Sequence, residues 1–373
     1  MRRRRSLNRL RRRAVYGVRR WLDRGLLPAL SGAAFLLEGR SRPAMGSTPK
    51  ETVMQEGKLR LQRVRPASQG CRPQPGQPPV ILIPPLMVRP YVYDLRPDHS
   101  MVGTLRAAGI DTFLVDFGVP DQDDEHIRLD DYVLDYVPRC VDEALRTSGA
   151  EQAYLVGYCM GGLFAVLHVA THRDDRIAGL VTIAAPIDFD EMGVLSIAGR
   201  LGVIAIDQLM DQLGNVPGEL SSLGFKIMGG PRTVTKYVDL LLNLYDESYV
   251  RGFGSINTWV NDLIPYPKEA FKQLVKDFVS GNKLAAGDLQ FDGKTADLHA
   301  IACPLLAFAG ENDNIATPRS TKRIIDLIGS RDRRFHSVPG GHIGVVAGGR
   351  APQMVWQPIV AWLKARGATG QGV

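Results

Sequence analysis

Apolar and polar residues alternate along the chain in a pattern that predicts short buried strands separated by helices. Short apolar runs bounded by Gly, Pro or Asp predict strands, because buried parallel strands have no polar face. Apolar residues at three- and four-residue steps predict helices. We expect strands at 80–83, 112–115, 153–156, 179–184, 305–309 and 334–338, and helices at 101–108, 129–146, 161–171, 317–328 and 353–365.

This order of strands and helices predicts an α/β domain, with a mostly parallel sheet covered by helices on both faces. Residues 187–300 interrupt the order with helical patterns and no further strand–helix–strand unit. We expect this insertion to form a helical cap over the active-site edge of the sheet, and the alternative is a second domain unrelated to the chemistry. The predicted parts are a basic arm (1–49), a first core part (50–186), the insertion (187–300) and a second core part (301–373). Five prolines in the stretch 66–79 predict an extended linker inside the first core part.

The charge is concentrated at one end of the chain. The formal net charge is +7, but residues 1–24 hold eleven Arg and one Asp, so they carry +10 and the rest carries −3. A slightly acidic body argues against a nucleic-acid-binding domain. Within the arm, apolar residues at helical spacing predict a helix that contacts a membrane or a granule surface, and the alternative is a solvated, partly disordered extension. These apolar positions are Leu7, Leu10, Ala14, Val18 and Trp21.

Other features bear on location and metal binding. No apolar run reaches the roughly 18 residues that suggest a membrane-spanning helix. The basic start followed by a short apolar run imitates a secretory signal, but the basic region is too long and no clear cleavage site follows. Cysteines 71, 140, 159 and 303 lie far apart, with no spacing suited to zinc, which favours a reducing cytoplasmic location and predicts no metal site.

The strongest local signal is the segment 157–162, Gly-Tyr-Cys-Met-Gly-Gly, between a predicted strand and a predicted helix. This is the context of a nucleophile elbow, normally G-x-S-x-G, with Cys159 in the place of Ser. The glycines allow a sharp turn, and the helix start brings the backbone N–H of Met160 toward a developing oxyanion. The alternative is a buried structural Cys on a glycine-rich turn.

The partners of a nucleophile follow later in the chain. Asp313 lies on the loop after the strand predicted at 305–309, and His342 follows the strand predicted at 334–338. The order nucleophile, acid, histidine is that of α/β-hydrolases. His342 would take the thiol proton of Cys159, and Asp313 would orient the imidazole, with Glu311 as the alternative acid. A thiolate nucleophile suits acyl transfer from thioesters, so these residues by themselves indicate an acyl transferase or a thioesterase.

Beyond these residues, the chain resembles the catalytic subunit of poly(3-hydroxyalkanoate) synthases, most of all the short class III type. The resemblance extends from about residue 50 to residue 366. The similar stretches are 89–95, 113–118 with 120–122, 129–132, 157–162, 214–218 and 340–344. The resemblance implies an α/β-hydrolase fold that polymerises 3-hydroxyacyl-CoA into a polyester and releases CoA. It also implies the triad Cys159, Asp313 and His342.

Further properties are implied only by this resemblance. Cys159 would hold the acyl group as a thioester, and a backbone N–H near Met87 would join that of Met160 in the oxyanion hole. No cofactor is implied, because the CoA thioester is the substrate. The partners would be 3-hydroxyacyl-CoA, the polyester chain, a second copy of the chain in a homodimer and an accessory synthase subunit. The location would be the surface of cytoplasmic polyester granules.

The chain departs from the family pattern beside the predicted site. Val88 stands where Asn is common, and Asn314 stands where His is common directly after the triad Asp. These departures leave open a related enzyme that transfers or hydrolyses acyl groups without polymerising them. The arginine-rich arm leaves open a granule-associated homologue with little catalysis. Cys140 matches a family cysteine, and its helical, apolar surroundings favour a structural role.

Overall fold

The computed structural model describes residues 44–67, 73, 76–193, 206–228 and 239–367. The contacts divide the chain into two units. One unit consists of residues 1–43 and 231–257, and its described part holds most of helix α11 (Glu247–Asn261). The other consists of residues 44–230 and 258–373 and contains every residue discussed below for the site. The predicted arm lies outside the described residues, except for its last few positions, as does part of the predicted linker.

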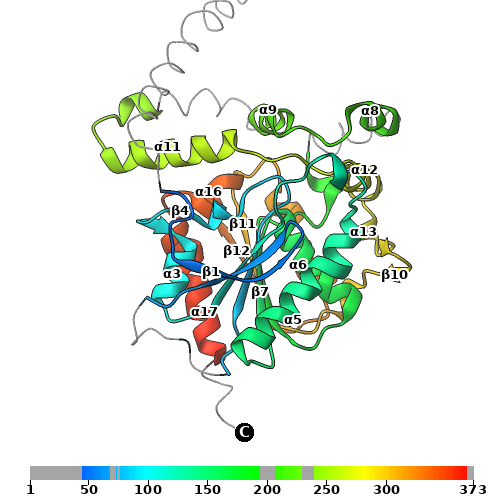
Figure 1. Cartoon of the computed structure of the whole chain (residues 1–373), viewed down its shortest axis with the longest axis horizontal. Helices are drawn as coiled ribbons and strands as arrows, with labels where there is room; N and C mark the ends of the chain where they lie inside the picture. The colour runs from blue at the N-terminus through cyan, green and yellow to red at the C-terminus, as the bar shows by residue number, and fades with distance from the viewer. Residues whose placement is uncertain (1–43, 68–72, 74–75, 194–205, 229–238, 368–373) are drawn as a thin grey trace, which may run out of the picture. The chain divides into compact units, whose positions relative to one another are not determined.

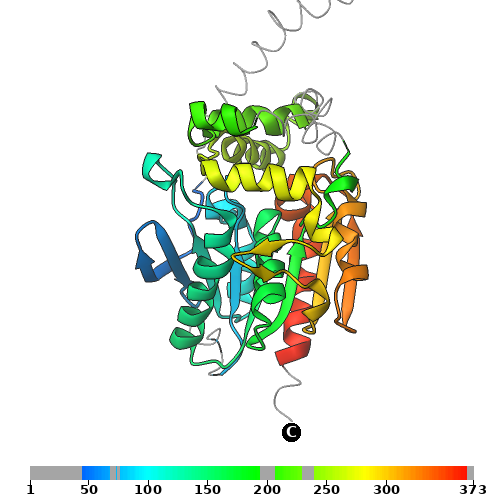
Figure 2. The same cartoon turned by 90° about the vertical axis from the view of Figure 1, so that its right-hand side faces the viewer.

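The larger unit is built on an eight-stranded sheet in the order β1-β2-β6-β3-β7-β8-β11-β12 (Figures 1 and 2). The six strands from β6 to β12 are parallel, and β1 and β2 form an antiparallel hairpin that joins the sheet at β6. The bounds are β1 Lys50–Glu56, β2 Leu59–Val64, β3 Val80–Ile83, β6 Thr112–Asp116, β7 Ala153–Tyr158, β8 Ile177–Ile183, β11 Leu305–Gly310 and β12 Arg333–Val338.

Helices cover both faces of this sheet (Figure 1). Helices α3 (Met101–Ala107) and α17 (Gln357–Gly367) lie on one face, and α5 (Val137–Ser148) and α6 (Met160–His172) lie on the other. Helix α6 is buried along nearly its whole length, because its sequence is apolar on every side. The six strands expected from apolar runs are all present, and five of them begin or end one or two residues beyond the predicted bounds.

Several local details differ from the expectations. The hairpin β1–β2 was not predicted, because charged residues alternate with its apolar ones. The helix expected at 129–146 contains a π-helical turn, η5 (Tyr132–Tyr136), between α4 (Leu129–Asp131) and α5. The helix expected at 317–328 is two short helices, α14 (Pro318–Lys322) and α15 (Ile324–Leu327). The helix expected at 353–365 begins with a π-helical turn, η10 (Pro352–Trp356).

The segment between β8 and β11 contributes no strand to the large sheet in its described residues. It contains α8 (Ile206–Leu213), α9 (Gly218–Met228), α11, α12 (Lys268–Gln273), η8 (Leu274–Ser280), α13 (Lys283–Ala286) and a small hairpin of β9 (Gln290–Phe291) and β10 (Lys294–Thr295). Whether this segment acts as a cap stays a prediction. Among the described residues, no helix is long and apolar enough to cross a membrane.

The sheet has a switch point between β3 and β7. From β3 the chain moves to β6 on one side and then returns to β7 on the other. In open parallel sheets the strand ends at such a point leave a crevice in which ligands bind. The segments that follow β3 and β7 contain Met87 and Cys159, two residues singled out from the sequence.

Candidate active site

Cys159 lies at a sharp turn between β7 and α6, as a nucleophile elbow requires. Its φ of 52° and ψ of −121° are rare for a residue with a side chain. Two backbone hydrogen bonds hold the turn. The Cys159 N–H donates to the carbonyl of Ile183 in β8 at 2.8 Å, and the Cys159 carbonyl accepts the N–H of Leu163 at 3.1 Å. The half-buried thiol is therefore presented at the carboxyl edge of the sheet.

The glycines around Cys159 are required by close backbone approaches. A Cβ atom on Gly161 would overlap the carbonyl oxygen of Ile83 in β3, and one on Gly157 would overlap the backbone of Gly161 and Gly162. A Cβ atom on Gly162 would lie 2.8 Å from that of Ala185. Helix α6 can therefore pack directly onto the ends of β3 and β7 only with glycine at these positions.

The acid is fixed by the loop that follows β11. Asp313 is buried, and one carboxylate oxygen accepts the backbone N–H groups of Ile315 and Ala316 at 2.8 and 3.0 Å. Its other oxygen, Oδ2, lies 2.7 Å from Nδ1 of His342. Glu311, the alternative acid, is exposed on the same loop. The structure therefore pairs His342 with Asp313.

His342 is the first residue of the short helix α16 (His342–Ala347) and is buried. Burial alone would lower the pKa of His342. The negative charge of Asp313 and the neighbouring Cys159 outweigh this effect, together with hydrogen bonds to both groups, and they raise the pKa of His342 to about 10. The three residues predicted as a triad thus meet at one place. The raised pKa of His342 favours a protonated imidazole beside Cys159.

The predicted oxyanion donors lie on the segments that follow two neighbouring strands, β3 and β7. Met160 is the first residue of α6, and the first N–H groups of a helix have no partner within the helix. Met87 follows β3, and its carbonyl accepts the N–H of Ile264 at 3.0 Å. Val88 is buried and Asn314 is exposed. The assignment of the two amides to an oxyanion hole stays a prediction.

Two tyrosines that the sequence analysis did not single out support the elbow. The Tyr93 hydroxyl donates to the carbonyl of Ile83 at 2.8 Å and accepts the N–H of Tyr158 at 2.8 Å, so it links the ends of β3 and β7. The Tyr158 hydroxyl donates to the carbonyl of His342 at 3.3 Å, and the two rings lie 5.1 Å apart. No sequence signal marks these roles, because the contacts join residues far apart in the chain.

Three other described residues, Cys140, Cys303 and His168, do not join the site. Cys140 is fully buried in α5, and burial raises the pKa of its thiol far above the usual range. Burial also raises the pKa of Cys303 to about 11. Cys71 lies outside the described residues. His168 is buried in α6 and contacts Asp174 at 3.1 Å, as a packing residue.

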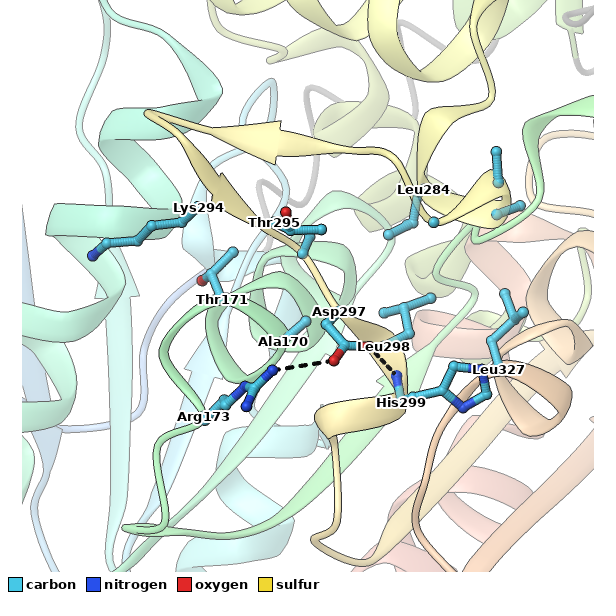
Figure 3. Close-up of a pocket in the computed structure, with 14 residues that line it drawn as sticks. Ala170, Thr171, Arg173, Leu284, Lys294, Thr295, Asp297, Leu298, His299 and Leu327 are labelled. Carbon is cyan, nitrogen blue, oxygen red and sulfur yellow. Dashed lines mark hydrogen bonds and ion pairs between the residues drawn. The ribbon is translucent and has the colours of Figure 1, made fainter.

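The structure also contains a separate cavity of about 610 Å³ at the far end of α6 (Figure 3). It is lined by the last turn of α6, by α13 and by the β10 region, and none of the predicted site residues lines it. Arg173 and Asp297 form an ion pair of 3.3 Å in its wall, and Asp297 accepts the N–H of His299 at 3.0 Å. Among the described residues, no group of three or more His, Cys, Asp or Glu side chains is placed to hold a metal.

Comparison with known proteins shows the family. A family model described as alpha/beta hydrolase fold matches residues 89–348. The poly(3-hydroxyalkanoate) polymerase subunit PhaC of Haloferax mediterranei is 35% identical over 347 residues, which cover 92% of this chain and 70% of that protein. The PhaC subunit of Allochromatium vinosum is 34% identical over 323 residues, which cover 86% of this chain and 90% of that protein. The chain belongs to the poly(3-hydroxyalkanoate) polymerase family.

Membership of the poly(3-hydroxyalkanoate) polymerase family confirms the resemblance found in the motifs and the prediction of an acyltransferase-type enzyme. The α/β-hydrolase fold is confirmed as well. A hydrolase from Pseudomonas aeruginosa PA01 shares this fold with a TM-score of 0.52 and 16% identity, covering 85% of this chain and 99% of that one. The class III assignment stays a prediction.

Proposed function

We propose that this chain polymerises 3-hydroxyacyl-CoA into a polyester with release of CoA, through a thioester on Cys159. The proposal rests on one observation above the others. In a member of the polymerase family, the buried pair of Asp313 and His342 stands beside a cysteine held in the strained turn of a nucleophile elbow. A nucleophile, a base and an orienting acid are the parts that covalent acyl transfer needs.

The first half-reaction loads the enzyme. Cys159 attacks the carbonyl carbon of the acyl-CoA thioester, and its proton resides on His342. The backbone N–H of Met160, with one near Met87, stabilises the oxyanion of the tetrahedral intermediate. When the intermediate collapses, the bond to the CoA sulfur breaks, and His342 returns the proton to the departing thiolate. One thioester replaces another, so this step is nearly balanced in free energy.

The second half-reaction extends the polyester. His342 accepts the proton of the 3-hydroxyl on an acyl unit, and that oxygen attacks the thioester carbonyl of another unit. An ester bond forms, a thioester bond breaks and the released thiol takes up the proton. Asp313 holds the imidazole through Nδ1, so Nε2 remains available to exchange protons with the thiol and the hydroxyl. No cofactor takes part, because the acyl-CoA supplies the activated group.

The proposed setting follows the family resemblance. The chain would act as a homodimer with an accessory synthase subunit, on polyester granules in the cytoplasm. The relatives' names support a polymerase subunit, and the arginine-rich arm supports contact with a granule surface.

The experiment is a CoA-release assay on purified full chain with short- and medium-chain 3-hydroxyacyl-CoAs, with and without the protein encoded next to it. We expect CoA release together with a high-mass polyester. Cys159→Ala should lower the rate by at least about a thousandfold, since the covalent step is lost. Cys140→Ala is the matched control, because Cys140 is buried in α5 and has no role in the steps above.

A second candidate function is acyl transfer or hydrolysis without polymerisation. It is motivated by Val88 and Asn314, the two departures beside the site. Release of free 3-hydroxy acid without polymer would favour this candidate, and high-mass polymer would exclude it. If the full chain releases no CoA even with the protein encoded next to it, the remaining alternative is a granule-associated homologue with little catalysis.

A further inference from the structure

Three buried tyrosines, Tyr93, Tyr158 and Tyr266, interact electrostatically with Cys159, and one of them has a hydroxyl without a partner. The hydroxyls of Tyr93 and Tyr158 are hydrogen-bonded, as described above. The hydroxyl of Tyr266 is buried and has no hydrogen-bond partner among the described residues. Leaving a buried hydroxyl unpaired destabilises the folded protein. A buried hydroxyl without a partner needs an explanation, and a ligand that binds it is one.

The backbone around Tyr266 is held tightly next to the active-site loop. Tyr266 exchanges two backbone hydrogen bonds with Val216, each of 2.9 Å. Two residues earlier, the N–H of Ile264 donates to the carbonyl of Met87, on the loop after β3. A Cβ atom on Gly218 would overlap the carbonyl oxygen of Leu263, so glycine is needed for this approach. The motif 214–218 found in the sequence thus fixes the position of Tyr266.

The side chain of Tyr266 lies in the same apolar cluster against which Cys159 packs. Its ring contacts Phe271 edge-on, with centroids 5.5 Å apart. Burial first, and the charge of Cys159 second, raise the pKa of Tyr266 far above its usual value. The hydroxyl therefore keeps its proton at any physiological pH and can serve as a hydrogen-bond donor within electrostatic range of Cys159.

We propose that the Tyr266 hydroxyl hydrogen-bonds the 3-hydroxyl oxygen of the acyl group at Cys159. This inference rests on the proposed function. The thioester carbonyl oxygen has its own predicted donors, the amides of Met160 and the Met87 loop. The 3-hydroxyl is the remaining polar atom of a 3-hydroxybutyryl group, and it would otherwise enter an apolar pocket without a partner. Pairing the two hydroxyls satisfies both and distinguishes 3-hydroxyacyl groups from plain acyl groups.

The test separates the enzyme's hydroxyl from that of the substrate. Binding of 3-hydroxybutyryl-CoA and butyryl-CoA is measured by calorimetry on full-length Cys159→Ala, with and without Tyr266→Phe. We expect Tyr266→Phe to weaken 3-hydroxybutyryl-CoA binding roughly tenfold and to leave butyryl-CoA binding within about twofold. Tyr154→Phe is the matched control, because it removes a tyrosine hydroxyl on β7 that lies outside the predicted site. It should change neither affinity.

Thermal unfolding without ligand gives a second, independent readout. We expect Tyr266→Phe to leave the midpoint unchanged or to raise it, since the unpaired hydroxyl is removed. Three results would overturn the proposal: an equal loss of affinity for 3-hydroxybutyryl-CoA and butyryl-CoA, no loss for either, or a clearly lowered unfolding midpoint. Failure of the proposed function would give a different result. Cys159→Ala would bind neither acyl-CoA, and the unmodified chain would release no CoA.

Discussion

At the scale of single residues, His342 determines how the site responds to pH. A pKa raised from 6.5 to about 10 means that the folded protein binds this proton more tightly than the unfolded chain does. The resulting stabilisation is complete below pH 6.5 and is lost as the pH rises toward 10. Its origin is the pairing with Asp313 and Cys159, which outweighs the cost of burying the charge.

We therefore predict that the unfolding free energy of the wild type falls between about pH 6.5 and pH 10 by more than that of His342→Gln. No single group can give a slope steeper than about 1.4 kcal/mol per pH unit. Urea unfolding at a series of pH values measures both proteins. Parallel curves for the two would show that His342 is not protonated preferentially in the folded state.

Sequence reasoning located the residues with chemistry but not the contacts that position them. Cys159, Asp313 and His342 were found because each stands directly after a predicted strand, and parallel strands end at one edge. The choice between Asp313 and Glu311 needed the structure, since only the turn to Ala316 shows which carboxylate is buried. No motif in the sequence marks Tyr266, which lies in the predicted insertion 187–300.

At the scale of elements, the junction of β7 and α6 depends on backbone packing that tolerates no side chain. We predict that Gly161→Ala destabilises the protein by about 3 kcal/mol or more, because the added methyl would overlap the backbone of β3. It should also abolish CoA release, since any relief of the overlap moves Cys159. Chemical unfolding and the CoA-release assay measure the two effects.

Gly224→Ala is the matched control for this prediction. Gly224 lies within α9, and a Cβ atom there would meet nothing within 4 Å. The same substitution should therefore stabilise by about 0.5–1 kcal/mol, as expected for glycine in a helix. If Gly161→Ala behaves like Gly224→Ala, the close packing of the elbow onto β3 is not a requirement of the fold.

The elements that the sequence predicted well are those with a uniform apolar pattern. All four residues of β3 and all six of β11 are buried, so their apolar runs are unbroken. The hairpin β1–β2 was missed because Arg60 and Arg63 interrupt its apolar residues. Arg60 pairs with Asp116, the last residue of β6, and Arg63 pairs with Asp111, just before β6, each at 2.7 Å. Cross-strand ion pairs of this kind depend on the tertiary neighbour and are invisible in a local window.

At the scale of the whole molecule, the charge is divided between the arm and the enzyme. Residues 1–43 hold thirteen Arg and two acidic residues, a charge of +11, so residues 44–373 carry −4. The described fold starts just after this point. Gly46 donates its N–H to the carbonyl of Asp94 at 2.7 Å, and Thr48 bonds the carboxylate of Asp94 through both its N–H and its hydroxyl. The folded body therefore has its own N-terminal anchor.

We predict that a chain starting at Ala44 keeps its fold and its CoA release but loses salt-sensitive binding to anionic surfaces. Each basic residue near such a surface contributes about 1 kcal/mol, and screening shortens this attraction to about 10 Å at 0.1 M salt. The full chain should therefore sediment with phosphatidylglycerol vesicles at low salt, at least tenfold more than the shortened chain, and much less at 1 M salt. Neutral vesicles are the control and should retain neither protein.

Equal sedimentation of the two proteins would mean that the arm is a solvated extension. If the full chain is retained on duplex DNA more than the shortened chain, the arm binds nucleic acid instead.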